Sequence, residues 1–94
     1  MPTKVENIAV KLLKAEDDDV SYAIKADVTH QKGEYDDDTD VIVEIQGIDR
    51  DGFEVLNVYL EGNVPFGQTK TLTKRVDYCD KNDFQSAVRW QAAK

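Results

Sequence analysis

Two runs of strand-forming residues on either side of a short turn, within residues 41–60, constrain this chain more than any other feature. The first run, V-I-V-E-I-Q over residues 41–46, alternates between apolar and mostly polar positions, and residues 55–60 form a second apolar run. The turn between them ends in Asp51 and Gly52. Glycine takes a positive φ at no steric cost and aspartate tolerates one. We therefore predict a β-hairpin.

The length of the chain, 94 residues, predicts a single domain over residues 1–94. A chain of this size buries roughly 60 to 65% of its unfolded surface, which is enough for one core without a disulfide or a metal. The apolar share of 40% and the charged share of 33% are typical of a soluble protein. No apolar run approaches the ~18 residues of a membrane span, so we expect no membrane insertion.

The N-terminal residues 1–7 contain no basic segment followed by an apolar one, the pattern of a secretory signal. We therefore expect a cytoplasmic protein, or an envelope-associated one if a signal segment has been removed. The net charge of −7 repels phosphate backbones and anionic lipid headgroups, so we expect no nucleic-acid partner.

Cys79 is the single cysteine of the sequence, so the chain forms no internal disulfide. Asp77 and Asp80 flank it, and nearby carboxylates disfavour the thiolate form. We interpret Cys79 as a structural or incidental thiol.

The first half of the chain predicts two strands before the hairpin. Residues 4–13 fit a helix nearly as well as a strand, but the absence of a convincing cap and the alternation over residues 8–12 favour a strand. Residues 20–30 alternate most clearly, with valine, tyrosine, isoleucine and alanine on one face, and predict a half-buried strand. The acidic segments 14–19 and 31–40, the second of which contains Tyr35, are expected to be loops.

The second half predicts a turn region over residues 61–67, where Pro65 cannot lie in a central strand. The threonine-rich residues 68–76 then alternate as a further strand, and residues 77–83 form another acidic loop. Residues 84–92 are ambiguous between helix and strand. We favour a strand, because Phe84, Val88 and Trp90 would then share one apolar face.

About six to seven strands joined by turns indicate an all-β, antiparallel, two-sheet sandwich, because a single sheet would leave one apolar face in water. The size matches an immunoglobulin-like β-sandwich. The paired cysteines and central tryptophan of antibody domains are absent from the sequence.

Residues 45–55, I-Q-G-I-D-R-D-G-F-E-V, followed by V-P-F-G-Q-T at residues 64–69 and a closing strand, resemble the small bacterial immunoglobulin-like domains of the FxLYD type. In that family an apolar strand ends in aspartate, a D-x-D-G-like turn follows, and a Pro-Gly-x-Thr-like stretch opens the next strand. The likeness covers the second half of the chain, and Ile48-Asp49 retains only the end of the F-x-L-Y-D string. The resemblance implies a noncatalytic, envelope-associated module.

Two motifs that bind ligands in other proteins fail here on specific residues. Residues 62–69 lack the lysine of a phosphate-binding loop and lead into a strand, so we interpret them as a glycine-proline turn. Asp36, Asp38 and Asp40 begin like an EF-hand loop, but Val41 and Gly47 replace the glycine and the glutamate that the loop requires. We expect no cofactor and name no metal ligand.

A Ca²⁺ site built from loops is the main alternative to a plain binding module. If successive strands alternate in direction, residues 16–19, 49–51 and 77–83 meet at one end of the sandwich, where carboxylates suit a hard cation. Solvated acidic turns are the simpler interpretation.

No catalytic constellation can be named from this sequence. His30 has no nucleophile placed to partner it, and we expect it to be a surface residue, while Phe84 and Trp90 are expected to lie in the core. We therefore predict a noncatalytic β-sandwich that binds another protein through its loops or a sheet edge, and we regard a small enzyme as the weakest alternative.

Overall fold

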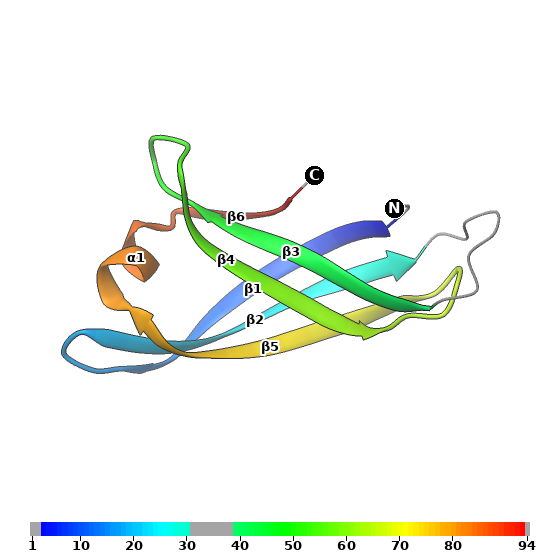
Figure 1. Ribbon diagram of the computed structural model, residues 1–94, viewed down its shortest axis with the longest axis horizontal. Coiled ribbons are helices and arrows are strands. Elements are labelled where there is room, and N and C mark those ends of the chain that lie inside the picture. Colours follow the sequence, from blue (N-terminus) through cyan, green and yellow to red (C-terminus); the bar gives the residue numbers. More distant parts are fainter. Residues whose placement is uncertain (1–2, 31–38, 94) are drawn as a thin grey trace.

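The computed structural model describes residues 3–30 and 39–93, and it has two antiparallel three-stranded sheets. The predicted all-β, two-sheet sandwich is confirmed. One sheet has the order β1-β2-β5 and the other β4-β3-β6, and Figure 1 shows β3 and β4 (green) crossing over β1, β2 and β5. The elements are β1 (Thr3–Ala15), β2 (Asp19–His30), β3 (Asp40–Ile48), β4 (Glu54–Asn63), β5 (Thr69–Asp80), α1 (Lys81–Ser86) and β6 (Arg89–Ala92).

Strand β2 lies at the centre of its sheet and supplies much of the core. Its even-numbered side chains are all buried, as the alternation predicts, and they include Tyr22, Ile24 and Val28. Strands β3 and β4 supply the facing side chains, above all Ile45 and Leu60, which are fully buried. The two sheets therefore bury a continuous apolar layer between them.

The predicted hairpin is confirmed as β3 and β4. The Asp49 carboxylate closes the turn, because its Oδ1 accepts hydrogen bonds from the backbone N–H groups of Asp51 and Phe53, both at 2.9 Å. Gly52 has φ +90° and donates its N–H to the carbonyl of Asp49 at 3.1 Å. The residue types of this turn thus match the backbone that they adopt.

Strand β1 is confirmed as a strand, and it lies at an edge of its sheet. Its pairing with β2 shifts register between Glu6 and Ala9, where Asn7 has φ 54°. Such a bulge interrupts the regular ladder of an edge strand and discourages edge-to-edge aggregation.

The prediction of one strand over residues 84–92 and a loop over residues 77–83 is wrong in part. Strand β5 continues to Asp80, α1 takes up residues 81–86, and only Arg89–Ala92 form a strand. The Asp80 side chain caps α1 by accepting from the N–H of Asp83 at 3.1 Å. Phe84 therefore comes from a helix, although its core role is confirmed, because it packs against the core together with Trp90.

His30 is buried, with 0% of its surface exposed, so the prediction of a surface histidine is wrong. It has the same strand parity as Val28 and so points into the sandwich. Its Nδ1 lies 2.9 Å from the carbonyl oxygen of Val64, and its ring lies 4.5 Å from that of Phe66, centroid to centroid. The segment after β4 folds over the end of β2, which the sequence pattern does not reveal.

No helix among the described residues is long and apolar enough to span a bilayer. Tyr35, Asp36 and Asp38, and with them most of the predicted loop at residues 31–40, lie outside the described residues.

Candidate interaction surface

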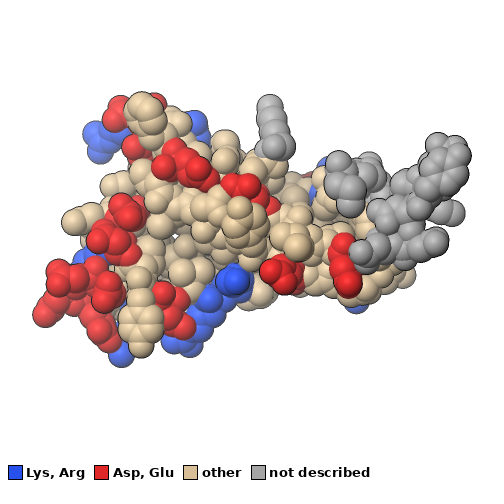
Figure 2. All heavy atoms as spheres, in the orientation of Figure 1, with Lys and Arg blue, Asp and Glu red and all other residues tan. Residues whose placement is uncertain are grey.

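The three acidic segments predicted to meet at one end of the sandwich do lie at the same end, on the left of Figure 1. Acidic side chains gather there in Figure 2. Lys81 joins two of the segments, because its backbone N–H donates to the carbonyl of Asp18 at 2.9 Å and its Nζ donates to the carbonyl of Glu16 at 3.1 Å. The topology therefore brings the predicted segments together.

This end does not assemble a cation site from the residues that the structure describes. Within residues 3–30 and 39–93, no three His, Cys, Asp or Glu side chains lie close enough to hold a metal ion. Two carboxylates are instead engaged by backbone N–H groups, that of Asp49 in the hairpin turn and that of Asp80 at the start of α1. These two carboxylates therefore stabilise local backbone structure.

Cys79 lies at the same end, and the residue is only 8% exposed. Burial raises the pKa of the Cys79 thiol, and the nearby carboxylates of Asp83, Asp80 and Asp19 raise it further. The predicted effect of Asp80 is therefore present. A thiol with a raised pKa stays protonated near neutral pH and is a poor nucleophile.

The predicted turn region over residues 61–67 begins later in the structure, because β4 continues to Asn63, and the turn lies between Asn63 and the start of β5 at Thr69. Gly67 has φ +76°, and the N–H of Gln68 donates to the carbonyl of Pro65 at 3.0 Å. Asp40, the one described member of the EF-hand-like series, begins β3 and accepts a hydrogen bond from Asn63 at 3.1 Å. Neither feature resembles a ligand-binding loop.

On the outer side of the β3–β4 hairpin, two large apolar side chains face solvent. Ile42 is 66% exposed and Tyr59 is 49% exposed. In the register, Ile42 lies opposite Glu61, and Glu44 lies opposite Tyr59. We call the outward side chains of these two strands the β3–β4 face; they are Asp40, Ile42, Glu44, Gln46, Asn57, Tyr59, Glu61 and Asn63.

Hydrogen bonds hold the polar side chains around these two apolar ones. Asn57 donates to the carboxylates of Glu44 and Glu54. At the other end of the face Asn63 donates to Thr39 and Asp40. The polar side chains are thus oriented, and Ile42 and Tyr59 stand between them.

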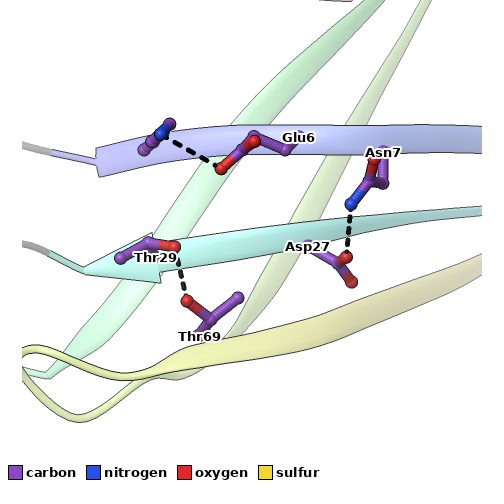
Figure 3. A network of polar contacts seen from close by, with 6 residues as sticks. Glu6, Asn7, Asp27, Thr29 and Thr69 are labelled. Atoms are coloured by element: carbon purple, nitrogen blue, oxygen red, sulfur yellow. Dashed lines mark hydrogen bonds and ion pairs between the residues drawn. The ribbon is translucent and has the colours of Figure 1, made fainter.

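The outer side of the other sheet is different, because its polar side chains pair with one another (Figure 3). Asn7 and Thr71 both donate to the Asp27 carboxylate, at 2.9 and 2.6 Å. The hydrogen bond from Thr71 and then that from Asn7 lower the pKa of Asp27. Thr29 and Thr69 bond to each other at 2.6 Å between their hydroxyl oxygens. These five polar side chains therefore bond to one another across the strands.

The β3–β4 face was not singled out from the sequence, although a signal was present. Ile42 lies at an outward position of an alternating strand, next to Glu44 and Gln46 in the same phase. An isoleucine at one of the outward, polar positions of an alternating strand is unexpected unless something covers it. Tyr59 gave no comparable signal, because its outward direction depends on the pairing of the two strands.

Comparisons of this chain with family models, with curated proteins and with solved structures find no match. The resemblance to FxLYD-type domains therefore stays a prediction.

Proposed function

We propose that this chain is a noncatalytic β-sandwich module that binds another protein through the β3–β4 face. The observation that carries the proposal is the exposure of Ile42 and Tyr59 at adjacent positions of one sheet face. Exposed apolar groups rimmed by polar residues are typical of interaction surfaces. Tyrosine is also enriched in such surfaces, because it combines a large apolar ring with a polar end.

The burial of His30 and Cys79, the two side chains best suited to nucleophilic chemistry, supports a noncatalytic role. His30 is fully buried, with its ring against Phe66 and its Nδ1 bonded to the Val64 carbonyl. Cys79 is buried at the acidic end, with its thiol pKa raised. Both side chains are therefore packed in the interior. A catalytic nucleophile and its base would instead need to be accessible and activated.

The β3–β4 face is also rigidly held, which favours binding without a large ordering cost. Strand β3 is central in its sheet, paired with β4 along its length and with β6 at its end. The inward side chains of the same strands, among them Val43, Ile45 and Leu60, are buried in the core. The outward side chains are therefore presented on a fixed backbone.

Site-specific photo-crosslinking in the cells that produce the protein tests this proposal. A photoreactive phenylalanine derivative at Tyr59 should form an adduct with a second protein, identifiable by mass spectrometry. Tyr78, which is 85% exposed and lies on β5, is the matched control position. Ile42→Ser should remove the adduct at position 59, since it removes the neighbouring apolar contact. Equal adducts at both positions, or none at position 59, would contradict the proposal.

A further inference from the structure

The charges of the two strands that form the β3–β4 face are of one sign. Strands β3 and β4 contain no lysine or arginine, and their acidic residues are Asp40, Glu44, Glu54 and Glu61. Figure 2 shows acidic side chains along the front of the molecule, where β3 and β4 lie in Figure 1. The face therefore combines exposed apolar groups with negative charge.

The other sheet has a mixed charge pattern. Its three strands contain seven cationic residues, namely Lys4, Lys11, Lys14, Lys25, Lys70, Lys74 and Arg75. The three ion pairs between described residues all involve β1 or β5, and they are Lys4–Glu6, Lys14–Glu16 and Arg75–Asp77. None of them includes a carboxylate of β3 or β4, so Glu44, Glu54 and Glu61 have no ion-pair partner within the described part of the chain.

The cations nearest to the β3–β4 face lie at its borders. Lys74 and Arg75 line a groove beside Tyr59 and Glu61, at the boundary with β5. Arg89 lies on β6, paired with Ile48 at the far end of β3. The charged side chains of the face between Ile42 and Tyr59 are the carboxylates of Glu44 and Glu61, of which Glu61 also borders the groove with Lys74 and Arg75.

The register places apolar and acidic side chains alternately in a two-by-two block. Ile42 faces Glu61 across the strands and Glu44 faces Tyr59, so each apolar side chain has an acidic neighbour both along its strand and across it. Directly opposite residues have Cβ atoms about 5 Å apart, and diagonal neighbours are about 7 to 8 Å apart. Ile42 and Tyr59 occupy one diagonal, and Glu44 and Glu61 occupy the other.

We propose that the β3–β4 face docks a cationic amphipathic helix of another protein. A helix with leucine-like residues at i, i+3, i+4 and i+7 presents an apolar stripe that can lie on Ile42 and Tyr59. Lysine or arginine residues beside that stripe then reach Glu44 and Glu61. This inference rests on the proposed function and adds the chemistry of the partner.

The negative charge of the β3–β4 face argues against the other molecules that could bind there. A second copy of this chain would bring the like-charged carboxylates of the face, those of Asp40, Glu44 and Glu61, to the contact, together with a net charge of −7. Anionic lipid headgroups and nucleic-acid phosphates would be repelled in the same way. A cationic protein segment is attracted by the carboxylates and has apolar side chains for Ile42 and Tyr59.

Titration of the ¹⁵N-labelled protein with a leucine-lysine helical peptide, followed by amide chemical shifts, tests the inference. Saturable shifts should appear in β3 and β4. A peptide with the same lysines but serine in place of each leucine should bind at least about tenfold more weakly, because it loses the apolar contacts. Dominant shifts outside β3 and β4, or equal affinity of the two peptides, would overturn the inference.

Two matched charge variants separate local recognition from general attraction to an acidic protein. Glu44→Gln with Glu61→Gln should weaken binding about fivefold or more, since each exposed ion pair contributes modestly. Asp17→Asn with Asp18→Asn removes the same charge at the acidic end and should change the affinity less than twofold. Equal weakening by both pairs would show that net charge alone attracts the peptide, and would overturn the inference.

The photo-crosslinking experiment at Tyr59 and the peptide titration can fail separately. An adduct at position 59 with a partner whose contacting segment is acidic or neutral would overturn the cationic helix and leave the proposed function standing. The absence of an adduct at position 59 would contradict the proposed function itself, whatever the peptide does.

Discussion

The rings of Tyr22 and Phe84 lie 5.0 Å apart, centroid to centroid, with an angle of 36° between their planes. Tyr22 belongs to the central strand β2 and Phe84 to the helix α1, so this contact attaches the helix to the sandwich. Trp90 of β6 also packs on Tyr22, at 5.8 Å between centroids. The buried ring of Tyr22 thus contacts both α1 and β6, the last two elements of the chain.

Phe84→Ala should therefore lower the free energy of unfolding by about 2 to 3 kcal/mol, since the ring is partly buried and packs on Tyr22. Urea denaturation measures the change. Gln85→Ala, one residue further along α1 at an exposed position, is the control and should stay within about 0.5 kcal/mol of the unmodified protein. Equal effects of the two substitutions would contradict the anchoring role of Phe84.

Gly52→Val should destabilise the domain by about 1 to 2 kcal/mol, because a β-branched residue at φ +90° is strained. A Cβ atom at this position would meet no atom within 4 Å, so the cost comes from the backbone and not from a clash. Gly52→Asn is the control and should cost less, because asparagine tolerates positive φ. If chemical denaturation gave the same midpoint for both variants, the turn would not have the backbone described here.

His30→Phe should destabilise the protein by about 1 to 3 kcal/mol. The new ring can still pack on Phe66, but the Val64 carbonyl loses the ring nitrogen that lies 2.9 Å away, and a buried acceptor without a donor is costly. Thr29→Val removes an exposed hydrogen bond at the neighbouring position and should cost much less. Thermal unfolding compares the two variants, and a melting temperature unaffected by His30→Phe would refute the assigned hydrogen bond.

Cys79 should react more slowly with iodoacetamide than an exposed thiol at the same pH. Burial and the carboxylates of Asp83, Asp80 and Asp19 raise the pKa of the Cys79 thiol, so less thiolate is present at a given pH. The alkylation rate should therefore rise only at higher pH than for a free thiol. Asp83→Asn should shift this profile toward lower pH, and an unshifted profile would show that this carboxylate does not influence the thiol.

Millimolar Ca²⁺ should stabilise the protein no more than NaCl at equal ionic strength. Screening relieves repulsion between carboxylates over ~8 to 10 Å for either salt, whereas a cation bound only to the folded state at a hundredfold excess over its Kd adds about 2.7 kcal/mol. Thermal melts in the two salts measure the difference. A rise specific to Ca²⁺ that Asp49→Asn abolishes would favour the calcium-binding alternative.

The features that could be predicted from the sequence are those that depend on a pattern of neighbouring residues. The alternation over residues 20–30 and the Asp-Gly turn at residues 51–52 each depend on neighbouring residues alone, and both strand and hairpin are confirmed. Residues 84–92 carried no such single pattern, since Phe84 and Val88 fit the period of a helix as well as that of a strand. The choice there depends on the cap at Asp80 and on the packing of Phe84 and Trp90 against Tyr22.

The sequence by itself determined the strand period of residues 20–30, the hairpin turn and the net charge, because each is a property of adjacent residues or of composition. Only the tertiary structure decided that His30 is buried under the segment containing Val64 and Phe66, and that Tyr59 stands beside Ile42 on an uncovered face. These outcomes depend on which segments pack or pair across the chain. Burial and exposure are set by such long-range contacts, which a pattern of neighbouring residues does not contain.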